Sequence, residues 1–262
     1  MEILLQGISV FMLIFCRMTA FFVVSPIFSS RTVPTTFKVG FSGIIALMIY
    51  LTIGSDQAVP SDLGYFMFII REVLIGLLMG YVANLLFAVI QMAGSFIDMQ
   101  VGFGIANVID PMTGASAPVL GNLKYIIATL MFLSINGHHY LLDAVIRSYN
   151  WIPLSNDLFQ KIYNGDLAEF LVQTFSNAFL LAFQMSAPLV VALFVTDVAL
   201  GFLARTAPQF NIFVIGIPVK IIVGLLVLLV LVPSFIYAFQ SLFEVLFNAM
   251  HDLLSVIGQR PK

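Results

Sequence analysis

The chain has 262 residues, of which 61% are hydrophobic and 9% are charged, and its mean hydropathy is +1.07. Soluble domains carry about 25% charged residues, so this composition excludes an ordinary water-soluble protein. The net charge of −2 and the lack of a basic stripe argue against a nucleic-acid partner, and a single cysteine, Cys16, excludes an internal disulfide framework.

Apolar segments predict about six membrane-crossing helices. A helix needs about 20 apolar residues to cross a bilayer. Long segments without charge lie between residues 72 and 98, 169 and 197, and 220 and 244. Shorter apolar stretches lie at 3–16, 39–53 and 125–137. The charges in the loops leave the orientation in the membrane open.

The third predicted helix carries two patterns. Gly76 and Gly80 are small residues one turn apart, a spacing that allows two helices to approach closely. Further along, Asn84, Gln91 and Asp98 recur every seven residues, which places them on one helical face. This polar face is interpreted as a contact or water-facing surface; the alternative is three polar residues that are merely tolerated.

Residues 102–121 are rich in glycine and contain an Asp110-Pro111 break. The segment is too flexible for a spanning helix and too apolar for a free loop in solvent. Irregular backbone is tolerated at membrane depth only where protein or water surrounds it. We therefore expect a re-entrant or cavity-filling loop; the alternative is an ordinary turn between helices.

Residues 187–220 place ionisable groups within apolar sequence that three prolines interrupt. The charged residues are Asp197, Arg205 and Lys220, and the prolines are Pro188, Pro208 and Pro218. An ionisable group at membrane depth costs a few kcal/mol, so it normally faces protein or an aqueous path. Asp197 and Arg205 are eight residues apart, too far to pair within one helix. Polar contacts between subunits are favoured over a proton relay.

The last segment, residues 239–257, is predicted to be an amphipathic helix. Its polar face holds Gln240, Glu244, Asn248, Asp252 and Ser255, and its apolar face holds Phe239, Leu242, Phe243, Leu246, Met250, Leu253 and Leu254. Such a helix packs against neighbouring helices or lies at the membrane interface, and the sequence does not choose between the two.

Recognisable catalytic motifs are absent from the sequence. The pair His138 and His139 lacks the spacing of helical zinc sites, and no nucleotide-binding glycine motif occurs in the right setting. Together with Asp143, the two histidines could hold a metal, but a histidine pair at the end of a loop is the commoner explanation. We expect no enzymatic activity, no catalytic residue, no metal and no cofactor.

The chain resembles the FliR family of flagellar type III export-gate proteins, whose injectisome relatives are called SctT. The first block of resemblance spans 91–111, with Gln91, Gly94, Asp98, Gln100, Gly102 and Asp110-Pro111. The second spans 187–220, with Ala187-Pro188, Asp197, Gly201, Arg205, Pro208, Asn211, Gly216, Pro218 and Lys220. The N-terminal region adds Arg17, Pro26, Pro34 and Lys38.

The resemblance implies an all-α membrane protein with about six hydrophobic helices, arranged as hairpins with broken helices and a Gly-rich plug loop. Residues 1–262 would form a single integral-membrane domain, built to pack into a helical hetero-oligomeric export gate. The implied partners are FliP-like and FliQ-like subunits, a FlhB-like switch protein, unfolded polypeptides in transit and membrane lipid. The implied location is the bacterial inner membrane at the flagellar basal body.

The resemblance also assigns roles to residues. The plug or gate residues would be Phe103, Gly104, Ile105, Val108, Ile109 and Met112. Polar residues that pack against other subunits would be Gln91, Asp98, Gln100, Asp197, Arg205, Asn211 and Lys220. Charges inside apparent spans, such as Arg71-Glu72 and Lys220, would lie in interfaces between proteins and not in lipid.

These features predict a structural and gating subunit of a type III protein export channel. The alternative is a self-sufficient secondary transporter of a small solute or ion, because broken helices and buried charges suit both. The transporter is disfavoured by the missing internal repeat, and an intramembrane protease by the missing motifs. The choice between flagellum and injectisome leans towards the flagellum.

Overall fold

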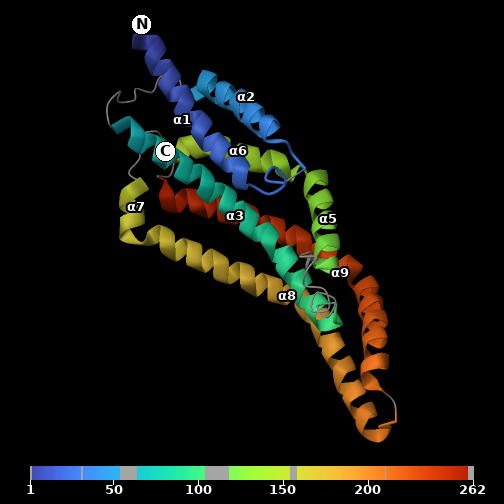
Figure 1. Cartoon of the computed structure of the whole chain (residues 1–262). Helices are drawn as coiled ribbons and strands as arrows, with labels where there is room; N and C mark the ends of the chain where they lie inside the picture. The colour runs from blue at the N-terminus through green and yellow to red at the C-terminus, as the bar shows by residue number, and fades with distance from the viewer. Residues whose placement is uncertain are drawn as a thin grey trace. The chain divides into compact units, whose positions relative to one another are not determined.

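The computed structural model of the chain describes residues 2–30, 32–53, 64–103, 118–153, 158–209 and 211–258. Within these ranges the chain forms eight α-helices and no strand, which confirms the all-α prediction (Figure 1). The helices are α1 (Glu2–Val24), α2 (Thr35–Ile53), α3 (Gly64–Val101), α5 (Val119–Ser134), α6 (Gly137–Trp151), α7 (Leu158–Asn164), α8 (Asp166–Thr206) and α9 (Ile212–Ile257).

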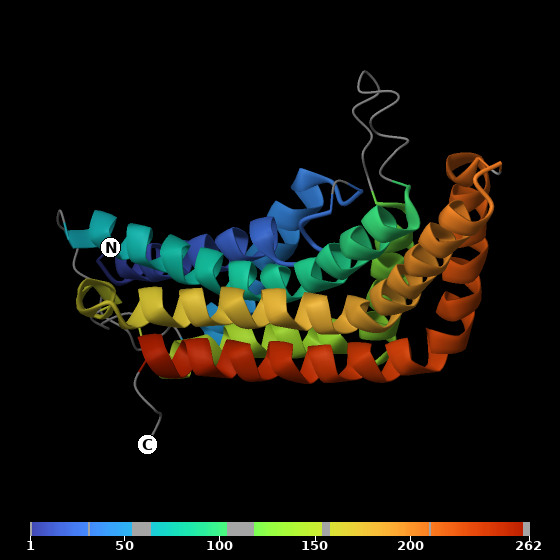
Figure 2. The same cartoon turned by 90° about the horizontal axis from the view of Figure 1, so that it is seen from below.

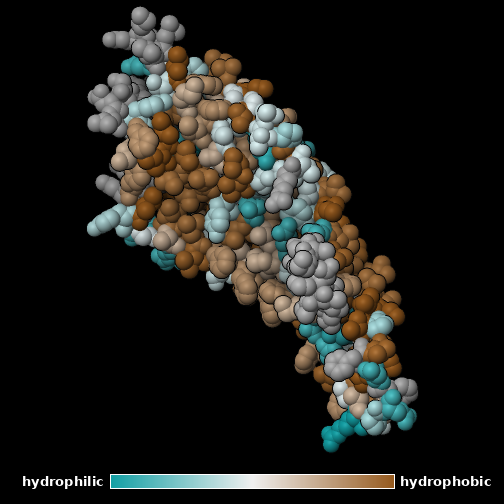
Figure 3. Space-filling view, viewed as in Figure 1, coloured by the Kyte–Doolittle hydropathy of each residue, from teal (hydrophilic) through white to brown (hydrophobic). Residues whose placement is uncertain are grey.

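Five of the described helices are long and apolar enough to cross a membrane, namely α1, α2, α3, α8 and α9. Helices α5 and α6 pass the same test only as a pair and are bent by 68° at the break between them, which gives six candidate spans. This agrees with the predicted number. Hydrophobic residues cover much of the visible surface, as Figure 3 shows.

The chain divides into two compact units that share three helices. The first unit contains Met1–Leu86, Asn136–Phe175 and Glu244–Lys262, and the second contains Phe87–Ile135 and Ser176–Phe243. Helices α3, α8 and α9 each contribute one part to either unit. Each unit has its own buried side chains, and each is described by itself below.

In the first unit, α1 packs closely on α3 at the two predicted glycines. A Cβ atom on Gly76 would collide with the main-chain carbonyl of Arg17, and one on Gly80 would lie 3.0 Å from the carbonyl oxygen of Phe21. The prediction that Gly76 and Gly80 allow close helix packing is therefore confirmed. Helices α1 and α2 form a second contact in this unit.

In the second unit, aromatic side chains join three helices. Phe87 on α3, Phe132 on α5 and Phe243 on α9 form a cluster, with ring centroids 5.1 Å apart for Phe87–Phe132 and for Phe132–Phe243. A second buried cluster lies near the end of α3 and contains Ile97, Val101, Leu120, Leu189 and Leu193. The parts of α8 and α9 nearest their connection run side by side as a hairpin (Figures 1 and 2).

The prolines break the helices less than expected. Helix α8 continues through Pro188, and α9 continues through Pro218 and Pro233. Only Pro208 of the three prolines in 187–220 falls between helices. A proline removes one intrahelical hydrogen bond, which a helix of 41 or 46 residues tolerates because its other hydrogen bonds remain.

The end of α9 has the burial pattern of an amphipathic helix. All seven residues of the predicted apolar face, from Phe239 to Leu254, are buried. Gln240, Glu244, Asn248 and Asp252 are exposed on the other face. The amphipathic segment is the last part of one long helix, and it packs against α6 through ring contacts of Phe247 with Tyr140 and of His251 with Trp151.

Candidate functional site where helices α3 and α5 meet

The side chain of Asp98 binds the first turn of α5. Its Oδ1 accepts a hydrogen bond from the backbone N–H of Leu120 at 3.2 Å, and its Oδ2 accepts one from Gly121 at 3.4 Å. Asp98 is 6% exposed. The first N–H groups of a helix have no partners within the helix, and a negative charge is favourable beside them. Asp98 therefore supplies α5 with an N-terminal acceptor from another helix.

The backbone of Asp98 also closes α3. Its carbonyl oxygen accepts hydrogen bonds from Gly102 at 3.2 Å and from Phe103 at 3.0 Å. Gly102 has a φ of 100°, which a residue with a side chain rarely adopts. This left-handed turn is a common way to end a helix, so the glycine fixes the point at which the chain leaves α3.

Two glycines bring the backbones of α3 and α5 together beside Asp98. A Cβ atom on Gly94 would collide with the backbone of Gly121, and one on Gly121 would lie 3.4 Å from the carbonyl oxygen of Gln91 on α3. Gly94 is four residues before Asp98, so both face the same neighbour. This crossing is what places the N–H groups of α5 within reach of the carboxylate.

A buried lysine follows on the same face of α5. Lys124 is 4% exposed, and its ammonium group lies 3.8 Å from the centroid of the Phe235 ring. Its Nζ has no hydrogen-bond acceptor among the residues described. Lys124 interacts electrostatically with Asp98, which provides the opposite charge.

A second polar group joins α3 to the hairpin of α8 and α9. The ammonium of Lys220 lies 2.9 Å from Asp197 Oδ1, and Gln100 donates a hydrogen bond of 2.9 Å to Asp197 Oδ2. Asp197 was expected to find its partner outside its own helix, and it finds two within the chain. Its side chain is still 38% exposed.

The remaining predicted polar residues lie apart from these groups. Gln91 is exposed on α3, and Arg205 is exposed in the last turn of α8 with no ion pair to any described residue. Asn211 precedes α9, and its carbonyl oxygen accepts hydrogen bonds from the N–H groups of Val214 and Ile215.

Most of the predicted plug lies outside the described residues. This applies to Gly104, Ile105, Val108, Ile109 and Met112. Phe103 is described; it is partly buried and packs against the cluster of Ile97, Val101, Leu120, Leu189 and Leu193. Both ends of segment 104–117 are thus described, one at Phe103 and the other at Pro118.

The first unit contains a buried ionic cluster that was not among the predicted site residues. The Arg17 Nε and Nη2 atoms donate to the two carboxylate oxygens of Glu72 at 2.6 and 3.0 Å. Arg17 Nη1 donates to the Ser148 hydroxyl at 2.8 Å, and its guanidinium lies 3.9 Å from the Tyr149 ring centroid. Arg17 and Glu72 are both fully buried.

Arg71 adds a second guanidinium to this cluster. Its Nη2 donates to Glu72 Oε1 at 2.8 Å and to the carbonyl oxygen of Pro153 at 3.2 Å. The expectation that Arg71 and Glu72 lie in interfaces between proteins needs correction, because both are buried within this chain. In the sequence, the signal of this cluster is the presence of isolated charges within apolar stretches. The spacing of these charges does not show which residues pair.

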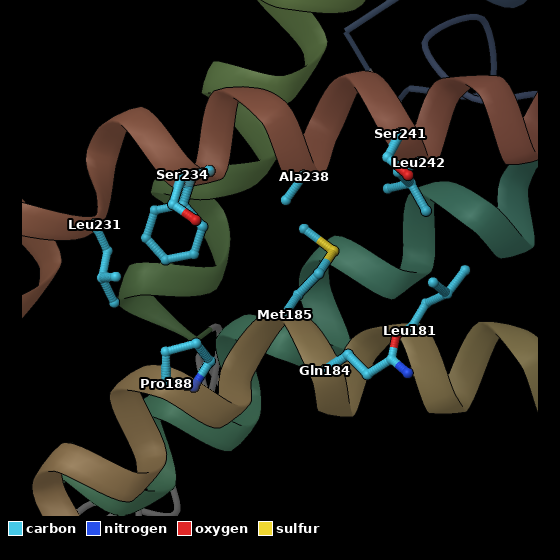
Figure 4. Close-up of a pocket in the computed structure, with 10 residues that line it drawn as sticks. Leu181, Gln184, Met185, Pro188, Leu231, Ser234, Ala238, Ser241 and Leu242 are labelled. Atoms are coloured by element: carbon cyan, nitrogen blue, oxygen red, sulfur yellow. The ribbon is translucent and has the colours of Figure 1, made fainter.

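A pocket of about 210 Å³ opens between α8 and α9 in the second unit. Gln184, Met185 and Pro188 line it from α8, and Ser234, Ala238 and Ser241 from α9, as Figure 4 shows. Elsewhere in the described residues no three metal-ligating side chains lie together, and His139 and Asp143 share only a shallow pocket on α6.

The chain matches a known protein family and several known proteins. Residues 8–246 match the family described as bacterial export proteins, family 1. The chain is 41% identical over 248 residues to the flagellar biosynthetic protein FliR of Bacillus subtilis, with 95% of each chain covered. It is 30% identical over 239 residues to FliR of Escherichia coli, covering 91% of this chain and 90% of that protein.

A relative that is named for Yop translocation is similar as well. The chain is 27% identical over 232 residues to the Yop proteins translocation protein T of Yersinia pestis, covering 87% of this chain and 88% of that protein. The family match spans most of the chain and includes α3, α5, α8 and most of α9. The chain therefore belongs to the FliR family of bacterial export proteins.

Proposed function

We propose that this protein is a membrane subunit of the flagellar protein export apparatus. The observation that carries the proposal is the 41% identity, over 95% of the chain, with a protein named for flagellar biosynthesis. The five or six helices able to cross a membrane fit a role in that membrane. A secondary transporter has no support among the relatives described above, which are named for flagellar biosynthesis or Yop translocation.

Deleting the gene in its own bacterium tests this function. We expect loss of the external flagellar filament and of secreted flagellin, and recovery of both when the gene is supplied from a plasmid. Electron microscopy of the cells and immunoblots of the medium measure these outcomes. Intact flagellar filaments, together with the loss of a different group of secreted proteins, would instead support a role in an injectisome.

We further propose that residues 102–121 form the gate element of this subunit. An export channel for unfolded chains needs a seal whenever no substrate is moving. The apolar side chains of Phe103, Ile105, Val108, Ile109 and Met112 can exclude water from a narrow passage, and glycines such as Gly104 permit rearrangement. The helix end at Gly102 and the start of α5 supply defined anchors for such a loop.

Removing residues 106–115 should make the membrane leak ions or small solutes. A sharper variant keeps the length of the loop and replaces Ile105, Val108, Ile109 and Met112 by Ser. It should leak as well, because the seal depends on the apolar side chains and not on chain length. Uptake of a normally excluded solute measures the leak. An unchanged uptake rate, with the protein still copurifying with its partners, would contradict the gate assignment.

The proposed partners are FliP-like and FliQ-like subunits and a FlhB-like protein in the bacterial inner membrane, at the base of the flagellum. The long apolar helices support this assembly, because α8 and α9 bury only 28% and 11% of the residues in their most apolar windows. Lipid or neighbouring subunits must cover the rest. Arg205, exposed on this hairpin, is proposed to bind a neighbouring subunit, as are the exposed residue Gln91 and the partly exposed Asp197.

A further inference from the structure

One side chain joins the two ends of segment 104–117. Asp98 closes α3 with its backbone carbonyl, which accepts hydrogen bonds from Gly102 and Phe103. The carboxylate of the same residue accepts the N–H groups of Leu120 and Gly121 at the start of α5. Asp98 therefore contacts both the end of α3, through its backbone, and the start of α5, through its side chain.

The N-cap residue of α5 supplies no side-chain acceptor at this end. This residue is Pro118, which makes no side-chain capping hydrogen bond. Side-chain caps normally satisfy the first N–H groups of a helix. Asp98 does so from across the helix interface, so α3 supplies acceptors for two N–H groups in the first turn of α5.

The surroundings strengthen these hydrogen bonds. Asp98 and Leu120 are both buried, so water competes little with the N–H groups of α5. The buried ammonium of Lys124 supplies an opposite charge one turn further along α5. A carboxylate at a helix N-terminus is a favourable arrangement.

We propose that Asp98 is a positioning residue that clamps the two ends of segment 104–117 together, with Lys124 as its counter-charge. The glycine crossing of Gly94 and Gly121 sets the gap that the clamp spans. The significance of this Asp98 clamp for export rests on the gate function proposed above. The clamp itself is a property of the described helices and can be measured without export.

Hydrogen exchange of the full-length protein in detergent tests the clamp. Asp98→Asn keeps the shape of the side chain but removes its charge and one acceptor. We expect the amides of Leu120 and Gly121 to exchange about tenfold faster, since hydrogen bonds to an ionised acceptor are roughly twice as strong as those to a neutral one. Amides of α1 and α6 should exchange as in the wild type, which shows that the variant is folded.

Asp197→Asn is the matched control. Asp197 is the other acid of the second unit with bonds to a neighbouring helix, but it contacts Gln100 and Lys220 and not α5. It should leave the exchange of Leu120 and Gly121 unchanged. Equal acceleration in both variants, or exchange in Asp98→Asn within twofold of the wild type, would overturn the clamp.

A double-mutant cycle tests the part played by Lys124. Lys124→Met keeps a long apolar stem and removes the charge. We expect it to accelerate exchange at Leu120 and Gly121, and to add nothing when Asp98→Asn is already present. If the two substitutions instead raise the exchange rates by independent factors, Lys124 does not act through Asp98 and is removed from the proposal.

The clamp and the gate can fail separately. Faster exchange in Asp98→Asn together with unchanged solute uptake in the loop variants would retain the clamp and contradict the gate role of segment 102–121. Unchanged exchange would overturn the clamp and leave the gate assignment to the loop variants described above.

Discussion

Single charged residues in this chain are stabilised by partners that are far away in the sequence. Arg17 and Glu72 are 55 residues apart, and Arg17 also reaches Ser148 and the carbonyl of Ile152. Glu72 is the shared acceptor, because both Arg17 and Arg71 donate to it. Breaking a buried ion pair costs about 3–5 kcal/mol, since one charge is left without compensation.

Glu72→Gln should therefore destabilise the protein more than Arg17→Met. Glu72→Gln leaves two buried guanidinium groups without a carboxylate, whereas Arg17→Met leaves Glu72 paired with Arg71. Thermal unfolding in detergent gives the order of the melting temperatures. Arg147→Met is the control; this residue belongs to an exposed pair with Asp143, which should contribute about 0–1 kcal/mol. A smaller loss for Glu72→Gln than for Arg17→Met would contradict the shared role of Glu72.

At the scale of helices, glycines set where two helices approach most closely. Gly76 and Gly80 bring α3 against α1, and Gly94 and Gly121 bring α3 against α5. At Gly76, Gly80 and Gly94 the nearest atoms include backbone of the opposite helix, which cannot move aside easily. The position of α5, and with it the reach of Asp98, follows from the second crossing.

Gly94→Ala should lower the melting temperature, because the added methyl group would strike the backbone of Gly121. Overpacking of this kind costs about 1–3 kcal/mol. Gly201→Ala is the matched control, since Gly201 also lies within a helix and a Cβ atom there meets nothing within 4 Å. It should be neutral or stabilise by about 0.4–1 kcal/mol. Equal melting temperatures for the two variants would show that α3 and α5 can separate at no cost.

At the scale of the whole molecule, the described surface is unusually apolar for a chain taken alone. The hairpin of α8 and α9 exposes large hydrophobic residues such as Phe194, Phe202 and Val230. Figure 3 shows hydrophobic side chains along this hairpin, with hydrophilic ones at its tip. Such a surface suits lipid or the helices of other subunits.

Arg205→Ala should reduce the amount of assembled complex before it changes conduction. Arg205 is exposed in the last turn of α8 and has no ion pair with a described residue. Loss of one charge-assisted hydrogen bond to a neighbouring subunit would lower complex yield about tenfold. Native mass spectrometry of the tagged complex measures the yield, and Arg147→Ala serves as an exposed control. Normal yield with altered proton flux would assign Arg205 a coupling role instead.

Periodicity and composition predicted the features that belong to one helix at a time. The number of candidate spans, the close packing at Gly76 and Gly80 and the all-α class agree with the structure. The same reasoning selected Asp98, Asp197 and Lys220 as polar residues that need partners, and the family resemblance added Gln100. The family resemblance placed Arg71 and Glu72 in contacts with other proteins, and spacing along one helix could not correct this because it does not report which residue of another helix lies opposite.

The sequence by itself determined that this is a helical membrane protein, about how many apolar spans it has and which residues cannot face lipid. These properties depend on local composition and on a repeat of 3.6 residues, both of which can be read from one segment. Only the tertiary structure decided that Arg17 pairs with Glu72, that Asp98 caps α5 and that Asp197 binds Lys220 and Gln100. Those pairings follow from how helices cross, and the crossings are set by contacts between residues 22 to 97 positions apart.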